Sequence, residues 1–202
     1  MFTGIIQEVG RVVELKHAKS IVRLTVYSPK IAPKVHPLES VAVNGVCLTV
    51  VARKGKHLMF EVIPETQQLT SLALLHPRSL VNLEPSLPLT GRFNGHVVLG
   101  HVDGTGKVVK SRQKPGERVL TIQVDRNLRR YLVPKGPVTV DGVSLTVGRK
   151  PGHTAFTVHL IPKTLKATSL AACRSGSRVN IEVDYFAKLF AEWLKPRVVT
   201  RY

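Results

Sequence analysis

The chain has 202 residues, 43% of them hydrophobic, and its two cysteines are too few for a disulfide framework, so Cys47 and Cys173 are expected to be free thiols in the cytoplasm. No segment approaches the ~18 apolar residues of a membrane span, and no secretion signal is recognisable at the start. The 30 Lys and Arg against 13 Asp and Glu leave a net charge of +17, but these cations are scattered and aromatic residues make up only 5%, so we expect no specific nucleic-acid site.

The first half of the chain predicts short β-strands. Five β-branched, apolar runs lie between turn residues, at 10–15, 21–28, 40–43, 46–53 and 57–62. Residues 65–75, which follow Pro64, are expected to form a short helix or helical turns. So many strands with so little helix favour a small closed antiparallel barrel, with a sandwich as the alternative, because closure removes exposed edges.

The second half repeats the first. Residues 41–50 (VAVNGVCLTV) return as 138–147 (VTVDGVSLTV) with seven of ten positions identical, and 62–73 return as 160–171 with seven of twelve identical. The chain therefore contains two copies of one unit, joined by a proline-containing linker near 85–94. We place the two barrels at 1–88 and 89–185, with a tail at 186–202.

The tail predicts one short amphipathic helix. Its apolar residues over 186–195 recur at spacings of three, four, seven and eight, which makes a single apolar stripe. So short a helix is not stable alone in water, so it must pack on another surface. That surface is either its own barrel or another subunit.

The repeated strands each carry an outward polar pair. Strand alternation directs Val46, Leu48 and Val50 into the first barrel and leaves Cys47 and Thr49 outside. In the second copy, Ser144 and Thr146 are the outward pair. Such pairs suit a ligand in a shallow cleft, although they can equally bond to nearby loops.

The two copies differ mainly at reactive positions. Cys47 corresponds to Ser144, Ile5 to His101 and Glu65 to Lys163, so duplicated sites have acquired different chemistry. His96 and His101 are five residues apart and no further ligand completes a zinc pattern, so no metal site is expected. The glycines after 100 match neither the dinucleotide fingerprint nor the phosphate loop.

Together these motifs resemble one known family. The start MFTGII, the NGVCLTV and DGVSLTV repeats, the IPET and IPKT repeats and GHVVLGHVDGTGKV are similar to the riboflavin synthase α-chain over about residues 1–184. The resemblance implies an all-β fold of two similar six-stranded Greek-key barrels in tandem plus a short C-terminal helix, which helps to assemble a homotrimer. It also implies a reaction without cofactor, in which two 6,7-dimethyl-8-ribityllumazine molecules exchange a four-carbon unit to give riboflavin and 5-amino-6-ribitylaminouracil.

The resemblance further implies two lumazine pockets, which in the family meet between the N-terminal barrel of one subunit and the C-terminal barrel of its neighbour. The first pocket is lined by Cys47, Leu48, Thr49, Glu61, Val62, Ile63, Pro64, Glu65, Thr66, Gly100, His101 and Val102. The second is lined by Gly4, Ile5, Ile6, Lys135, Ser144, Leu145, Thr146, Ile161, Pro162, Lys163, Thr164, Leu165 and Lys166.

Four residues are candidate catalytic groups: His101, Cys47 and Ser144 from the two pockets, and Asp184. His101 is expected to assist proton transfer, and Cys47 and Ser144 to position water or act as nucleophiles. Asp184 is expected to orient Ser144 or a water. We expect positioning of the two substrates to matter more than any single acid or base.

The chain departs from the family pattern at Lys163, where the second copy commonly has His, and at Asn94, which replaces a usual Gly. Its high positive charge is compatible with an acidic partner such as the lumazine synthase shell, or with a solvated basic surface. The rival functions are a non-catalytic lumazine or flavin carrier, which shares the fold, and a basic nucleic-acid-binding barrel.

Overall fold

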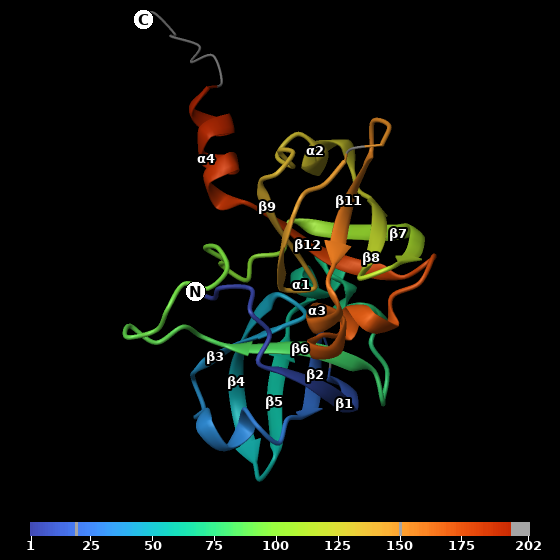
Figure 1. The fold of residues 1–202 in the computed structure, drawn as a ribbon. Coiled ribbons are helices and arrows are strands. Elements are labelled where there is room, and N and C mark those ends of the chain that lie inside the picture. The colour runs from blue at the N-terminus through green and yellow to red at the C-terminus, as the bar shows by residue number, and fades with distance from the viewer. Residues whose placement is uncertain (19, 150, 195–202) are drawn as a thin grey trace, which may run out of the picture.

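The computed structural model describes residues 1–18, 20–149 and 151–194, and its first half is a closed six-stranded antiparallel barrel (Figure 1). The strands lie in the order β1-β2-β5-β4-β3-β6. The pairing of β2 with β5, which is not its neighbour in sequence, is typical of a Greek key. Their bounds are β1 (Glu8–Ala18), β2 (Ile21–Tyr27), β3 (Ser40–Val43), β4 (Val46–Lys54), β5 (His57–Val62) and β6 (Leu80–Pro85), and the short helices between them are η1 (Ala32–Lys34), α1 (Pro64–Leu69) and η2 (Ser71–Leu74).

The second half repeats this order as β10-β9-β12-β7-β8-β11. Its strands are β7 (Gly104–Lys114), β8 (Glu117–Gln123), β9 (Pro137–Val140), β10 (Val143–Thr146), β11 (Ala155–Leu160) and β12 (Arg178–Val183), with α2 (Arg126–Arg129), α3 (Pro162–Ala167) and η3 (Ser169–Ala172) between them and α4 (Tyr185–Trp193) after them. The prediction of two tandem six-stranded units followed by a short helix is confirmed.

The second sheet differs from the first at one seam. β4 continues to Lys54 and pairs with β5, whereas the matching strand β10 ends at Thr146 and forms no ladder with β11. Instead, the backbone N–H of Gly148 donates to the Thr157 carbonyl at 2.8 Å, and the Thr157 N–H donates to the Arg149 carbonyl at 2.8 Å. Gly148, where the first copy has Val51, lets the backbone approach closely, because a Cβ there would lie 2.6 Å from Thr157 Oγ1. The predicted closed barrel is therefore completed by a full strand ladder only in the first copy.

Each barrel has its own apolar core, produced by the period-two pattern. Val46, Leu48 and Val50 of β4 are buried in the first core, and Val143 and Val147 lie in the second. The outward residues Cys47 and Ser144 are only half-buried, while Thr49 and Thr146 are exposed. The strand alternation predicted from the sequence is confirmed.

The two barrels meet at a pseudo-twofold contact between the turn at 44–45 and the turn at 141–142. The Asn44 Oδ1 accepts from the Asn82 N–H at 2.8 Å, and the matching Asp141 Oδ1 accepts from the Asn180 N–H at 2.7 Å. Each asparagine then reaches across the contact, since Asn82 Nδ2 donates to the Asp141 carbonyl and Asn180 Nδ2 to the Asn44 carbonyl. This buried network fixes how one repeat sits on the other.

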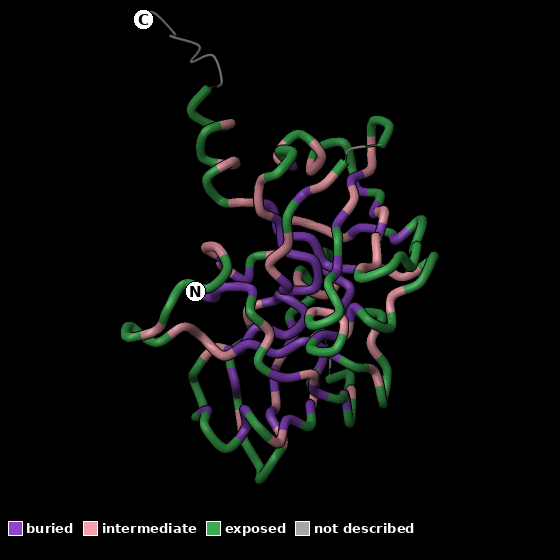
Figure 2. Tube along the Cα trace, in the orientation of Figure 1, coloured by how far each residue is buried: buried purple, intermediate pink, exposed green. Residues whose placement is uncertain are grey.

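Helix α4 extends away from the second barrel, and Figure 2 shows it as intermediate and exposed along its length. Asp184 caps its start by accepting from the Phe186 N–H, and Lys188 anchors it through a 2.9 Å ion pair with Asp103. Phe190 is 68% exposed and Leu194 is 82% exposed. The helix thus matches the prediction in place and amphipathic pattern, while the part of the predicted tail at 195–202 lies outside the described residues.

Candidate functional site

The segment before the first strand of each copy packs against the other copy, which builds two matched polar sites. The Cys47 N–H donates to the Gly100 carbonyl at 2.8 Å, and the Ser144 N–H donates to the Gly4 carbonyl at the same distance. Val102 packs against the first core and Ile6 against the second. The two copies therefore exchange one wall of their sites, as the resemblance implies.

Glycine is required at both crossing points. Gly4 has φ of 77° and Gly100 has φ of 78°, a conformation that favours glycine. A Cβ at Gly4 would lie 2.6 Å from the Cβ of Ser144, and a Cβ at Gly100 would lie 2.6 Å from that of Cys47. The absent side chains are what let each polar residue of β4 and β10 lie directly on the crossing backbone.

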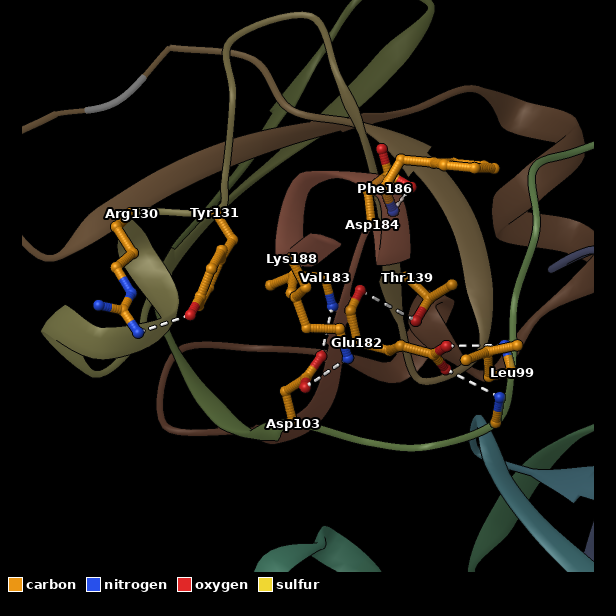
Figure 3. A network of polar contacts seen from close by, with 11 residues as sticks. Leu99, Asp103, Arg130, Tyr131, Thr139, Glu182, Val183, Asp184, Phe186 and Lys188 are labelled. Atoms are coloured by element: carbon orange, nitrogen blue, oxygen red, sulfur yellow. Dashed lines mark hydrogen bonds and ion pairs between the residues drawn. The ribbon is translucent and has the colours of Figure 1, made fainter. Parts of the chain in front are cut away.

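Two buried glutamates hold these crossing segments in place. The Glu84 carboxylate accepts from the N–H groups of Thr3 and Gly4 and from the Thr3 hydroxyl, at 2.7–2.9 Å. Glu182 accepts from the N–H groups of Leu99 and Gly100, at 2.7 and 3.1 Å (Figure 3). Burial raises the pKa of both carboxyls, that of Glu182 to about 7, because the charged form loses its solvation.

The second site opens into a cavity of about 780 Å³. Six of the residues predicted for the second pocket line it: Lys135, Ser144, Leu145, Thr146, Ile161 and Thr164. Pro134, Val147, Gly148, Arg149 and His159 complete the wall. The cavity is large enough for a two-ring or three-ring heterocycle with a short chain.

His96, which the sequence analysis considered only as a metal ligand, contacts the polar residue of this site. The His96 Nδ1 lies 2.7 Å from the Ser144 Oγ. Burial lowers the pKa of His96, with a smaller opposing effect from the negative charge of Asp184, so the imidazole is neutral at pH 7. In the neutral tautomer that carries its proton on Nε2, the Nδ1 accepts the hydroxyl proton, and in that tautomer the pair has the arrangement of a base and a hydroxyl.

The other candidate catalytic residues occupy different surroundings. His101 is exposed and follows the Gly100 that supports Cys47. The carboxylate of Asp184 accepts from the Phe186 N–H at 3.2 Å, while the Ser144 hydroxyl has His96 as its hydrogen-bond partner. The negative charge of Asp184 opposes the lowering of the His96 pKa by burial, and the role predicted for Asp184 at Ser144 or a water stays a prediction.

The remaining predicted residues surround the two sites at different depths. Leu48 and Val62 are buried in the first core, and Leu165 packs against the second. Glu61 and Thr66 are half-buried on the first site's side, and the exposed members are Ile5, Ile63, Pro64, Glu65, Pro162, Lys163 and Lys166.

Comparison of the copies could not have found His96, whereas Phe2 has a counterpart, Val98, at the offset that matches Gly4 with Gly100. The segments match with Gly4 against Gly100, so the counterpart of His96 would precede the first residue of the chain. Phe2 is fully buried in a small cluster with Ala42, Val98 and Cys47. It lies between the Cys47 site and the Thr3–Gly4 backbone at Ser144. The signal that was available is the apolar Phe2 itself, two residues before the repeated glycine.

Comparison with known proteins agrees with this geometry. The Lumazine binding domain model matches residues 3–86 and again 99–184. The chain is 42% identical over 194 residues to riboflavin synthase of Bacillus subtilis (strain 168), covering 96% of this chain and 90% of that protein. It belongs to the riboflavin synthase family. Another member, riboflavin synthase of Mycobacterium tuberculosis (strain ATCC 25618 / H37Rv), is 41% identical over 191 residues, covering 93% of this chain and 95% of that protein.

Solved structures of another protein, LumP, show the same fold. LumP complexed with riboflavin superposes with a TM-score of 0.85 at 24% identity, covering 91% of this chain and all of LumP. LumP complexed with 6,7-dimethyl-8-(1'-D-ribityl) lumazine gives a TM-score of 0.82 at 23% identity.

Two further observations bear on the class of site. Among the described residues, no three His, Cys, Asp or Glu side chains are grouped as metal ligands. None of the helices that the structure describes is long and apolar enough to span a membrane.

Proposed function

We propose that this chain is a riboflavin synthase, which converts two molecules of 6,7-dimethyl-8-ribityllumazine into riboflavin and 5-amino-6-ribitylaminouracil by transfer of a four-carbon unit. The observation that carries the proposal is the pair of matched sites, in which Cys47 lies on Gly100 and Ser144 lies on Gly4. A reaction between two copies of one substrate needs two similar pockets. The family relatives at about 40% identity over nearly the whole chain support the same activity.

Most of the rate enhancement is assigned to positioning. Two lumazines held face to face react as if within one molecule, which contributes on the order of 7–11 kcal/mol. The rigid barrel strands β4 and β10 present the outward pairs Cys47–Thr49 and Ser144–Thr146. The threonine hydroxyls are assigned to the carbonyl and ring-nitrogen groups of the substrates, and the exchange rearranges the atoms of two identical molecules, so it needs no net oxidant or reductant.

Proton transfer is assigned to the imidazole groups. One lumazine must lose a proton from its acidic C7 methyl group, and the neutral His96, bonded to Ser144, is placed to receive a proton through the serine hydroxyl or through a water that the hydroxyl holds. The exposed His101 serves the same purpose at the Cys47 site. Asp184 favours the protonated form of His96 by its charge.

The productive site is assigned to the contact between subunits of a homotrimer. Helix α4 presents exposed apolar side chains at Phe186, Phe190 and Leu194, which water disfavours and a second copy of the chain would cover. The compartment is assigned to the cytoplasm, since Cys47 and Cys173 are both unpaired. A lumazine synthase shell is proposed as a partner, because an acidic surface would suit the high positive charge of the chain.

The alternative function is a lumazine or flavin carrier, which the fold of the LumP structures favours. A single experiment separates the two: incubation of the purified chain with 6,7-dimethyl-8-ribityllumazine alone, followed by riboflavin absorbance. Riboflavin formation supports the synthase. Tight binding without product would support the carrier. If the chain neither binds the lumazine nor forms product, the remaining interpretation is a basic barrel of another kind.

A further inference from the structure

The two matched sites differ in charge. Five positions around them differ between the copies in the same direction, and in each case the second copy has the more basic side chain. The pairs are Leu38 and Lys135, Ala52 and Arg149, Glu61 and His159, Glu65 and Lys163, and Gln68 and Lys166. The first site is thus bordered by two carboxylates and no cation at these positions, and the second by four permanent cations and a histidine.

The cations of the second copy border its cavity from several elements. Lys135 precedes β9, Arg149 follows β10, His159 lies in β11, and all three line the cavity of about 780 Å³. Lys163 and Lys166 belong to α3, beside the lining residues Ile161 and Thr164. A ligand that fills the cavity therefore meets positive charge on more than one side.

Lys135 and Arg149 have no acidic partner among the described residues, whereas the first copy neutralises its own charge. Glu61 accepts from Arg23 Nε at 3.2 Å. In the second copy the carboxylate of Glu117 is already shared between His159 at 2.6 Å and Lys114 at 3.3 Å. Lys135 is also held in the left-handed region with φ of 68°, because its N–H donates to the Val147 carbonyl beside the cavity. Within the part of the chain that the structure describes, the charges of Lys135 and Arg149 are therefore uncompensated.

We propose that the second-copy pocket is selective for anionic ligands, and that it binds a flavin that carries a phosphate on the end of its ribityl chain more tightly than the uncharged flavin. This inference rests on the proposed function for the pocket itself and adds a class of ligand to it. A phosphate dianion is the group that best uses several cations spread around one opening. Binding of such a flavin would compete with the lumazine substrate, so the pocket would also be a site of inhibition by a phosphorylated form of the product.

The high overall charge of the chain does not account for this contrast. A generally basic surface would place cations around both sites, yet two of only 13 acidic residues lie at the matched positions of the first copy. The difference is local to the second pocket.

The test compares dissociation constants for riboflavin and riboflavin 5'-phosphate, measured by quenching of flavin fluorescence at low and at 0.5 M salt. A few exposed charge pairs acting together give an expected preference for the phosphate ester of about tenfold at low salt. Salt should reduce this preference, because exposed charges are screened. The double variant R149A/K163A should bring the ratio of the two constants close to one, and inorganic phosphate should compete weakly.

Two control variants make the result specific. Lys54→Glu changes the charge at the distant β4–β5 turn and should leave the ratio unchanged. Glu65→Lys gives the first copy the residue of the second and should add to the preference for the phosphate ester. Equal affinities in the unaltered chain, or a ratio that falls as much in Lys54→Glu as in the double variant, would overturn the proposal. A chain that turns over lumazine but shows no phosphate preference refutes this inference alone, whereas a chain that neither binds riboflavin nor makes it refutes the proposed function.

Discussion

At the scale of single residues, the two copies keep the geometry of their sites and change the chemistry. Cys47 and Ser144 both donate their N–H to a glycine carbonyl of the crossing segment at 2.8 Å. The thiol lies with the buried Phe2, while the hydroxyl is bonded to His96. One scaffold thus presents two similar sites, each with a different reactive group.

The first prediction concerns these two residues. Ser144→Ala and Cys47→Ala are each expected to lower kcat by roughly tenfold to a hundredfold, at or below the lower end of what a positioned acid or base contributes, because substrate positioning is left intact. The measurement is the rate of riboflavin formation at saturating lumazine. Complete loss of turnover in both variants, with unchanged circular dichroism, would contradict the emphasis on positioning.

The second prediction concerns pH and His96. Burial lowers the pKa of this histidine from 6.5, so its base form predominates at pH 7 and is lost as the pH falls through that lowered pKa. We expect kcat to fall on acidification with an inflection below pH 6.5, and His96→Gln to remove that inflection. Glu182, whose pKa is about 7, also titrates, so Glu182→Gln serves as the comparison: the low-pH inflection should remain in it.

Residue roles were only partly readable from the sequence. The strand alternation correctly placed Cys47 and Ser144 outside their barrels, because period two depends on local geometry alone. The bond between His96 and Ser144 joins residues 48 positions apart through a segment without regular structure, and no pattern encodes such a contact. Asp184, predicted to orient Ser144 or a water, also caps α4, a function that the preceding strand and the following apolar stripe do indicate. Its role at Ser144 or a water stays a prediction.

At the scale of elements, the two turns at the pseudo-twofold contact perform the same task with different residues. Asn44 and Asp141 each receive the N–H of the partner asparagine on the last strand of their copy. The amide of Asn44 does not ionise, whereas Asp141 does, and burial raises the pKa of Asp141 to about 7. The contact between repeats therefore contains one titratable position.

The third prediction follows from that position. Since the pKa of Asp141 is raised from 3.8 in the folded chain, its contribution to stability is present at low pH and is lost as the pH rises through about 7. Asp141→Asn keeps the acceptor and copies Asn44, so it should raise the free energy of unfolding by roughly 1–3 kcal/mol above pH 8 and by much less below pH 5. Urea unfolding at both pH values measures this. An equal gain at both would show that the carboxyl is not the cause.

The elements themselves were largely predictable, since turn residues separate short β-branched runs and the internal repeat confirms each run twice. The seam beside β10 was not, because the second copy has the same VSLTV pattern as the first up to residue 147. The difference begins at Gly148, where two backbone hydrogen bonds between Thr157 and the residues Gly148 and Arg149 replace the strand ladder. The open seam borders the cavity of the second site, which Gly148 lines.

At the scale of the whole molecule, the duplicated sites and the exposed helix point to the same arrangement. Phe2 and Thr3 lie between the Cys47 site and the Ser144 site, so buried backbone separates the two within one chain. Two stacked substrates need pockets that face each other, which the second subunit of the proposed trimer would supply. Helix α4 offers the apolar surface for assembly, and its base is fixed by the Lys188–Asp103 ion pair (Figure 3).

The fourth prediction tests assembly. Phe190→Asp places a charge on the apolar stripe of α4, where the side chain is 68% exposed, so it should not disturb the barrels. We expect the trimer to dissociate into folded monomers, measured by light scattering after size exclusion. Turnover should fall far more than the affinity for riboflavin, because each pocket stays intact while the shared site is lost. A variant that remains a trimer would show that α4 is not the contact.

The final prediction asks whether one site takes its two halves from different subunits. Thr49→Lys and Thr146→Lys each place a long side chain in one outward pair, and each variant alone should be nearly inactive because every site then contains one blocked half. Subunits of the two variants, mixed under conditions that allow exchange, should recover a measurable share of activity, since some contacts then join an intact first half to an intact second half. Each variant mixed with itself is the control, and a mixture that exchanges subunits but stays inactive would show that both halves come from one chain.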